Sequence, residues 1–262
     1  MASGRYTHAL VSRVPAAART LHTPAGSPSV CVETAREQQA GLVARLRALG
    51  LDVLELPPDE LSPSSVFLAD CCVCCQGLAL VCRPGRGERK ADTDTVRAVL
   101  KRELGLPLAE LNSPTALLNS SDVLFTGREF FVGIGEETNM EGAGAVAATW
   151  PEFPCSPVSL PEPSCRLTDR LAVAGPDILA VGSSPASRAL LRRVEQAAQH
   201  RWVTHPTPPH LTLSRYHTLT LPEERAVNCL YVSGSLLHTH STEIPLSAQV
   251  LKPVTSFIHV DL

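Results

Sequence analysis

Cysteine thiols are the most reactive side chains in this sequence, and four of its nine cysteines lie in the string CCVCC at Cys71, Cys72, Cys74 and Cys75. The two C-x-x-C spacings in this string also occur in zinc sites. The string belongs to an apolar run that predicts a strand, whose side chains alternate between two faces. Cys72 and Cys74 then point to one face and the other two to the opposite face, so four ligands cannot converge on one ion. We interpret these thiols as small apolar groups packed in the interior, and we predict no metal site.

Three histidines recur every five residues, at His200, His205 and His210. Imidazole is a common metal ligand, but three prolines in the same segment deny it a helix that would align the rings. We interpret residues 200–213 as an irregular, solvated insertion.

Among the charged side chains, Asp70 directly follows an apolar run. Its carboxylate could cap a turn or hold a cationic ligand, and the residues alone leave both interpretations open. The basic cluster nearby is balanced by acidic neighbours, which favours a solvated loop leading into a helix over a phosphate site. Its members are Arg83, Arg86, Arg89 and Lys90.

The composition limits the class of protein. Of the 262 residues, 44% are hydrophobic, which is enough apolar material for a core. The formal net charge of -3 argues against a nucleic-acid binder. The N-terminal residues lack a secretory signal, and no apolar run is long enough for a membrane span. We therefore expect a cytoplasmic protein with reduced cysteines, no membrane association and no nucleic-acid partner.

Hydrophobic periodicity predicts alternating strands and helices along the first half of the chain. Apolar residues recur with helical spacing over 33–49 and again over 92–104, and Gly50 and Gly105 follow these helices as stop signals. The expected strands are 7–14, 51–56, a hairpin within 66–82, and 106–111.

In the second half, two apolar runs flank a turn at residues 126–129, which predicts a β-hairpin over 121–133 with Arg128 and Glu129 as exposed turn charges. Thr138 and Glu141 form a capping-box signature for a helix ending near Trp150. Ser184 followed by a proline predicts the start of another helix, to about residue 199. The other expected elements are strands at 157–160, 171–173, 178–181, 228–232, 235–238 and 257–261 and a helix at 246–251.

An internal repeat organises these elements. The strings LGLDVLEL, from Leu49, and LGLPLAEL, from Leu104, share one pattern of helix end, glycine and strand. Such a repeat indicates a repeated supersecondary unit. Counting along the chain predicts an α/β protein of four β-β-α-β units and one N-terminal β-α-β unit, forming a single domain over residues 1–262.

The string SDVLFTGREFFVG, from Ser121, followed by Thr138 and Asn139, resembles the dimethylarginine dimethylaminohydrolase family. Further similar blocks, in family order, are VLELPPDE, VFLAD, ALVCRPG, AGPDILAVGSS and NCLY. The resemblance implies a five-module α/β propeller of the pentein type found in guanidine-modifying enzymes. In that family a C-terminal strand completes the first module, and we expect the ring to be incomplete because this chain stops at Leu262.

The resemblance also implies a chemistry. In the family, a cysteine near the C-terminus attacks the guanidinium carbon of an N-omega-methylated arginine, and water then releases citrulline and a methylamine, relieving inhibition of nitric oxide synthesis. A histidine serves as general acid and base, acidic side chains hold the cationic head group, and arginines bind the substrate carboxylate. This chemistry uses only side chains and water, so no cofactor is implied.

The family's binding residues are partly kept. Phe67 and Asp70 match a Phe-Val-Glu-Asp pattern, but Ala69 replaces its glutamate, so one carboxylate of the guanidinium clamp remains. Arg89 matches a substrate-binding arginine. Glu137 stands where a second arginine would be, which reverses the charge. The resemblance thus implies Phe67, Asp70 and Arg89 as substrate-binding residues.

The catalytic residues are not kept. Arg166 stands at the family histidine position, and a guanidinium with a pKa above ~12 cannot cycle a proton near neutral pH. The segment with the nucleophile is expected to lie beyond Leu262. We therefore predict no intact catalytic residue and little or no hydrolysis. The alternative is a non-catalytic paralogue that binds a protein partner, or an arginine-like ligand at Asp70 and Arg89.

Overall fold

The computed structural model describes residues 6–21, 30–85, 89–162, 164–199, 216–252 and 260–261. These residues form five small sheets, each built from strands that are consecutive in the sequence. The segment 200–213, predicted to be an irregular insertion, lies outside the described residues.

The first sheet pairs β1 (His8–Ser12) in parallel with β2 (Asp52–Leu56), and α1 (Val32–Ala48) connects them. The helix ends as predicted, because Gly50 has φ +85°, a left-handed conformation that costs glycine little. Among the described residues β1 pairs only with β2, so this sheet has two strands where the other four have three.

The second module begins later than the sequence predicts. Its elements are β3 (Cys72–Cys75), β4 (Leu78–Val81), α2 (Lys90–Arg102) and β5 (Leu108–Ala109). The hairpin was expected from residue 66, but Leu68–Cys71 forms a 3₁₀ turn instead. Asp70 is buried there with polar partners, and these contacts hold the backbone in a turn rather than a ladder.

The third module contains the most family-specific string. Its elements are β6 (Val123–Phe125), β7 (Phe130–Ile134), α3 (Met140–Thr149) and β8 (Cys155–Ser159). The hairpin is confirmed, but the helix cap is wrong by one residue. Asn139 caps α3, its Oδ1 accepting from the Gly142 N–H at 3.0 Å, whereas Thr138 is buried and donates to Asp122. An amide at the N-cap suits this geometry as well as a hydroxyl does.

The fourth and fifth modules repeat the same order. Their elements are β9 (Leu171–Gly175), β10 (Ile178–Gly182), α4 (Pro185–Ala197), β11 (His217–Leu221), β12 (Leu230–Val232), β13 (Ser235–His238), α5 (Pro245–Leu251) and β14 (Val260–Asp261). Ser184 caps α4 as predicted, accepting from the Ser187 N–H at 3.1 Å. β11 has no counterpart among the predicted strands, since its HTLTL sequence follows the segment that was predicted to be an insertion and presents mostly polar faces.

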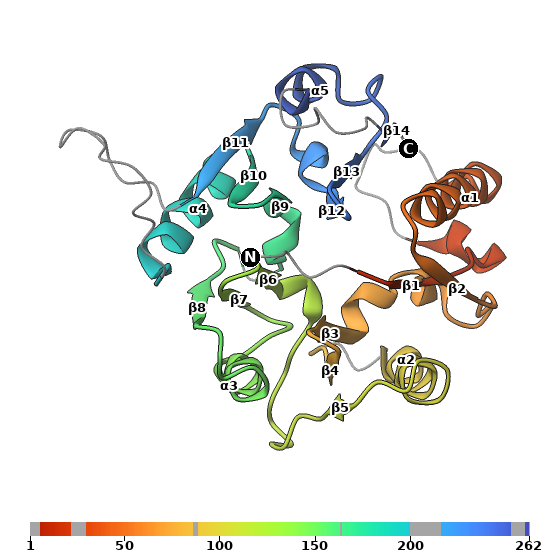
Figure 1. Ribbon diagram of the computed structural model, residues 1–262, viewed down its shortest axis with the longest axis horizontal. Helices are drawn as coiled ribbons and strands as arrows, with labels where there is room; N and C mark the ends of the chain where they lie inside the picture. Colours follow the sequence, from red (N-terminus) through yellow and green to blue (C-terminus); the bar gives the residue numbers. More distant parts are fainter. Residues whose placement is uncertain are drawn as a thin grey trace.

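Figure 1 shows the five sheets arranged in a ring, with the helices α1 to α5 on the outside and the first strands of the three-stranded sheets nearest the centre. Each three-stranded sheet has an antiparallel hairpin followed, after a helix, by a parallel strand. The predicted α/β fold of repeated β-β-α-β units is therefore confirmed.

Contacts between modules overturn one prediction about turn charges. Glu129 was expected to be exposed, yet it is fully buried and accepts hydrogen bonds from the Tyr216 hydroxyl at 2.5 Å and the Gln199 N–H at 2.8 Å. Arg128 pairs with Asp177 of the next module at 3.1 Å. The turn of the third module is covered by the fourth, a contact that local sequence does not encode.

The cysteines divide between two environments. Cys71 and Cys75 are buried, as expected for small apolar packing, whereas Cys74 is exposed and Cys72 is half-buried. The prediction of interior packing was therefore wrong for the latter pair, because the face of β3 that carries both residues is only partly covered. All nine thiols are free.

The described residues contain neither a metal-binding cluster nor a membrane-spanning helix. No group of three or more histidine, cysteine or acidic side chains is arranged to hold a metal ion. Within the same part of the chain, no helix combines the length and the apolar character needed to cross a membrane.

Candidate functional site

Asp70 is a buried carboxylate held between two guanidinium groups. It lies in the 3₁₀ turn before β3 and is 3% exposed. Its Oδ1 accepts from the Ser121 hydroxyl at 2.5 Å and from Arg166 Nη1 at 3.4 Å. Its Oδ2 lies 3.6 Å from Arg89 Nη1. A buried carboxylate requires such neutralisation, and two guanidinium groups supply it here.

Arg89 is turned toward the protein interior. It precedes α2 and is 9% exposed, which corrects the prediction that it belongs to a solvated loop. Its Nη groups donate to the carbonyl oxygens of Ser64 and Phe67 at 3.0 and 2.6 Å, and its Nε pairs with Asp92 at 3.0 Å. Its Nη donors are thus directed at protein atoms.

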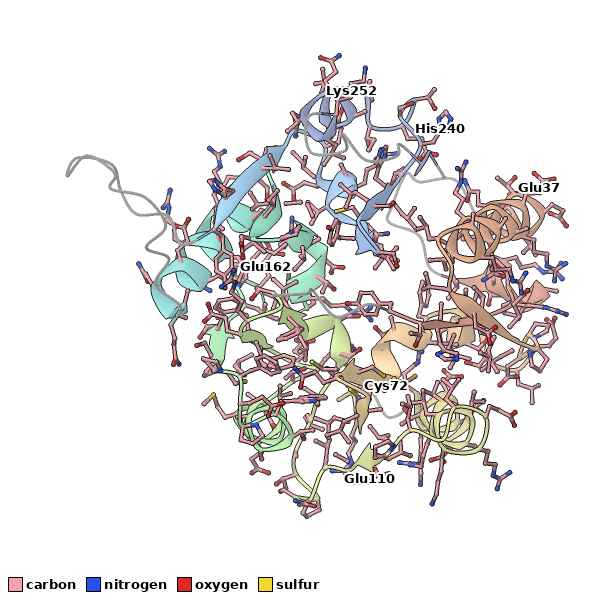
Figure 2. All side chains as sticks on the ribbon, viewed as in Figure 1. Glu37, Cys72, Glu110, Glu162, His240 and Lys252 are labelled. Atoms are coloured by element: carbon pink, nitrogen blue, oxygen red, sulfur yellow. The ribbon has the colours of Figure 1, made fainter. Side chains whose placement is uncertain are left out.

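Arg166 contacts the other oxygen of the Asp70 carboxylate, Oδ1. It is the N-cap residue of the 3₁₀ turn Leu167–Asp169, on the segment that leads from β8 to β9, and Glu162 marks this segment in Figure 2. The side chain is 37% exposed. Arg166, which the resemblance places at the family histidine position, therefore lies beside Asp70 and directs its guanidinium group at that carboxylate.

Asp122 is a site residue that the sequence reading missed. It is 1% exposed, and its two oxygens accept from the Thr138 hydroxyl at 2.7 Å and the Leu167 N–H at 3.2 Å. Burial raises the pKa of Asp122 to about 6, although both hydrogen bonds and the Arg166 charge act to lower it. The sequence did carry a signal for this residue, because Ser121 and Asp122 open the most family-specific string. In the structure Ser121 contacts Asp70, and Asp122 binds the N–H of Leu167, which follows Arg166.

The other predicted residues lie at the margin of the cluster. Phe67 exposes 48% of its surface, and its contribution to the cluster is its backbone carbonyl. Glu137 lies against Gly85, where an added Cβ would meet the Glu137 Cα at 3.3 Å. The charge of Glu137 also contributes to the raised pKa of Asp122, which places it within electrostatic reach of the site.

Sequence comparison decides the family. A human protein named putative hydrolase DDAH2 is 35% identical to this chain over 96% of its length and 86% of the human protein, and its bovine counterpart is 34% identical over the same shares. This chain belongs to the dimethylarginine dimethylaminohydrolase family. A dimethylarginine dimethylaminohydrolase from Pseudomonas aeruginosa is 30% identical over 44% of both chains. No protein-family model matches the chain.

Solved structures agree on the fold. The P. aeruginosa dimethylarginine dimethylaminohydrolase, solved as a cysteine-to-serine mutant in complex with citrulline, superposes with a TM-score of 0.77 at 22% identity, over 98% of this chain and 93% of that one. SxtG, an amidinotransferase from Microseira wollei, gives a TM-score of 0.67 at 12% identity, over 95% and 87% of the two chains. The fold is thus shared across guanidine-modifying proteins of low sequence identity.

Two thiols lie close to the cluster in this family member. Cys71 accepts a contact from Arg89 Nη2 at 3.7 Å, and Cys165 accepts one from Arg170 Nε at 3.4 Å. Burial nevertheless raises the pKa of both thiols, and outweighs the arginine beside each. Since the thiolate is the nucleophile, neither residue is prepared to attack a guanidinium carbon.

The arrangement suits charge pairing better than proton transfer. Asp70 can bind a guanidinium group, and in this structure the chain's own Arg166 provides one. Asp122 is the group whose pKa lies near neutrality, but it is buried and its oxygens are occupied by Thr138 and Leu167.

Proposed function

We propose that this chain is a non-hydrolysing member of the dimethylarginine dimethylaminohydrolase family that binds a cationic guanidino compound at Asp70. One observation carries the proposal: Arg166 Nη1 lies 3.4 Å from Asp70 Oδ1. A guanidinium from the chain itself thus contacts the one carboxylate of the resembled clamp that is left. An external guanidinium would replace it, so binding is weak in the native chain.

The same observation argues against turnover. General acid and base catalysis requires a group that gains and loses a proton near the working pH, and a guanidinium does not. Burial of the neighbouring thiols raises their pKa, and Asp122 has its oxygens occupied. Binding therefore persists in this proposal while hydrolysis is lost.

Known relatives support the ligand class. The P. aeruginosa relative binds citrulline, and another solved dimethylarginine dimethylaminohydrolase forms an adduct with S-methyl-L-thiocitrulline. Both ligands carry a planar group related to guanidine at the end of an amino-acid side chain. In this chain Glu137 repels a ligand carboxylate and Arg89 is directed at protein atoms, so an amine such as agmatine binds more tightly than arginine.

Turnover is tested by incubating the purified chain with asymmetric dimethylarginine and measuring citrulline, with the P. aeruginosa enzyme as a positive control. We expect no release above the buffer background. Release that disappears when one of the nine cysteines is replaced by serine would overturn the non-hydrolysing part of the proposal.

Binding is tested by titration calorimetry with agmatine and with arginine. Arg166→Ala should tighten agmatine binding about tenfold, because a charge-assisted hydrogen bond contributes roughly 1.5–3 kcal/mol and about 1.4 kcal/mol is a factor of ten. Arg193→Ala is the matched control, since this exposed arginine donates to the Ser159 carbonyl instead.

Asp70→Asn, checked for folding by circular dichroism, should abolish binding. Unchanged affinity in Arg166→Ala, or tighter binding of arginine than of agmatine, contradicts the assigned roles of Arg166 and Glu137 respectively.

A further inference from the structure

Cys72 and Cys74 form a pair of neighbouring thiols that the proposed function does not use. They lie two residues apart on the same face of β3, and their sulfur atoms are 3.7 Å apart. Cys74 is exposed and Cys72 is half-buried. Figure 2 labels Cys72 on the side of its sheet toward the centre of the ring. Solutes can therefore reach one sulfur while the second lies within contact distance of it.

The two thiols also differ in acidity. A hydrogen bond from the Cys72 thiol lowers the pKa of Cys74, and the same pairing, together with burial, raises the pKa of Cys72. By contrast, burial raises the pKa of Cys75 and Cys155 to about 11 and that of Cys229 to about 12. An exposed thiol of lowered pKa beside a second thiol is the usual arrangement in redox-sensing cysteines.

We propose that Cys72 and Cys74 are a redox modification site that a hydroperoxide converts to an intrastrand disulfide. The Cys74 thiolate attacks one peroxide oxygen, the S–O bond forms and the O–O bond breaks, and hydroxide leaves to give the sulfenic acid. Cys72 then attacks this sulfur, the S–S bond forms, and the sulfenic oxygen departs as water. Two thiols lose two electrons in total, and one hydrogen peroxide becomes two waters.

The position in the fold permits this bond and makes it reversible. Residues two apart in an extended strand have Cα atoms roughly 6.6 Å apart, at the upper end of the range for disulfides, so β3 must bend locally out of its extended geometry for the bond to form. In the described sheet β3 has a single neighbour, β4, so bending disturbs only one set of ladder hydrogen bonds. The two-residue turn at Gln76 and Gly77, with φ +50° and +77°, follows at once and can absorb the change. A strained, exposed disulfide is readily reduced.

The test uses the reduced 262-residue chain exposed to about one equivalent of hydrogen peroxide, quenched with N-ethylmaleimide and digested with trypsin. The tryptic peptide 48–86 contains five cysteines: Cys71, Cys72, Cys74, Cys75 and Cys82. We expect five labels without peroxide and three after it, with the mass of two hydrogens lost and the bond mapped to Cys72 and Cys74. Dithiothreitol should restore all five labels. Five labels retained after peroxide would overturn the proposal.

Single variants assign the two roles. In Cys72→Ser, peroxide should leave Cys74 as a sulfenic acid that dimedone traps, and Cys74→Ser should form no disulfide in this peptide. Cys31→Ser is the control, because it removes an exposed thiol that contacts Thr34 and Glu33 rather than another cysteine. A disulfide that persists in either β3 variant, or one that requires Cys31, would show that other sulfurs react.

Discussion

Asp70 and Asp122 occupy similar positions in successive modules but have different surroundings. Each belongs to a 3₁₀ turn directly before the first strand of its sheet, and they are 3% and 1% exposed. Asp70 lies between the guanidinium groups of Arg89 and Arg166. Asp122 is held by a hydroxyl and a backbone N–H, and its pKa rises to about 6.

The difference shows how the same local element acquires different chemistry. Burial penalises a carboxylate at both positions. Full positive charges from two other segments offset the penalty at Asp70, whereas neutral donors offset it only in part at Asp122. The first residue is therefore suited to pairing with cations and the second to pH-dependent protonation. Four predictions test this comparison, from the largest expected effect to the smallest.

Removing the Asp70 carboxylate should have the largest effect. Asp70→Ala leaves Arg89 buried with Asp92 as its remaining acidic partner, and breaking a buried ion pair from one side costs about 3–5 kcal/mol. The free energy of unfolding in urea measures it. Asp52→Ala, at an exposed carboxylate, is the control and should change stability by less than about 0.5 kcal/mol. A cost for Asp70→Ala as small as the control's would show that the guanidinium groups do not depend on Asp70.

Asp122 should make stability depend on pH with the opposite sign to a salt-bridged carboxylate. Its pKa is about 6 in the folded chain against 3.8 when unpaired, so the folded state binds the proton more tightly between these values. The stabilisation that Asp122 adds to the free energy of unfolding is fully present below about pH 4. It is lost as pH rises through 6, and the total loss is on the order of 3 kcal/mol.

The measurement compares urea unfolding of the native chain and Asp122→Asn from pH 4 to pH 7. The native chain should lose stability relative to the variant as pH rises, because the amide does not titrate. A stability difference that is constant with pH would mean that Asp122 ionises normally.

Deleting the hydroxyl beside Asp122 should have a smaller effect. Thr138→Val removes the donor to Asp122 and the acceptor for the Asn119 N–H, which leaves buried groups unpaired at a cost of about 1–3 kcal/mol. The pKa of Asp122 should also rise further, extending the window of its pH dependence. Thr138→Ser keeps the hydroxyl and should retain the native pH profile.

Deleting the hydroxyl beside Asp70 should have the smallest effect. Ser121→Ala removes one donor, but Arg89 and Arg166 still neutralise the carboxylate, so the expected loss is about 1 kcal/mol or less in thermal or urea unfolding. A loss larger than that of Thr138→Val would reverse the comparison and identify Ser121 as the main partner of Asp70.

Local signals predicted most of the secondary structure. The Ser184 cap and the following proline placed α4 correctly, Gly50 marked the end of α1, and the paired apolar runs located β6 and β7. Capping, left-handed glycine and strand alternation depend on residues within a few positions of one another. The repeated strings at Leu49 and Leu104 likewise predicted the repeated unit, because each copy folds on its own segment.

Local sequence could not predict which side chains meet across modules. Glu129 was expected in solvent and is buried by Tyr216, Arg89 was expected in a loop and lies inside, and Asp122 was overlooked although Thr138 and Leu167 make it part of the site. Each contact joins segments that are distant in sequence, and the packing of neighbouring elements against one another decides which side chains meet.

The sequence by itself thus determined the family and the repeated β-β-α-β unit. It also indicated Asp70 and Arg166 as residues that match binding and catalytic positions of the resembled family. Only the tertiary structure decided that the Arg166 guanidinium contacts Asp70, that Asp122 has a pKa near neutrality, and that Cys74 is exposed beside Cys72. The reason is that charge pairing, desolvation and exposure depend on distances between segments, and packing of the modules around a common centre sets those distances.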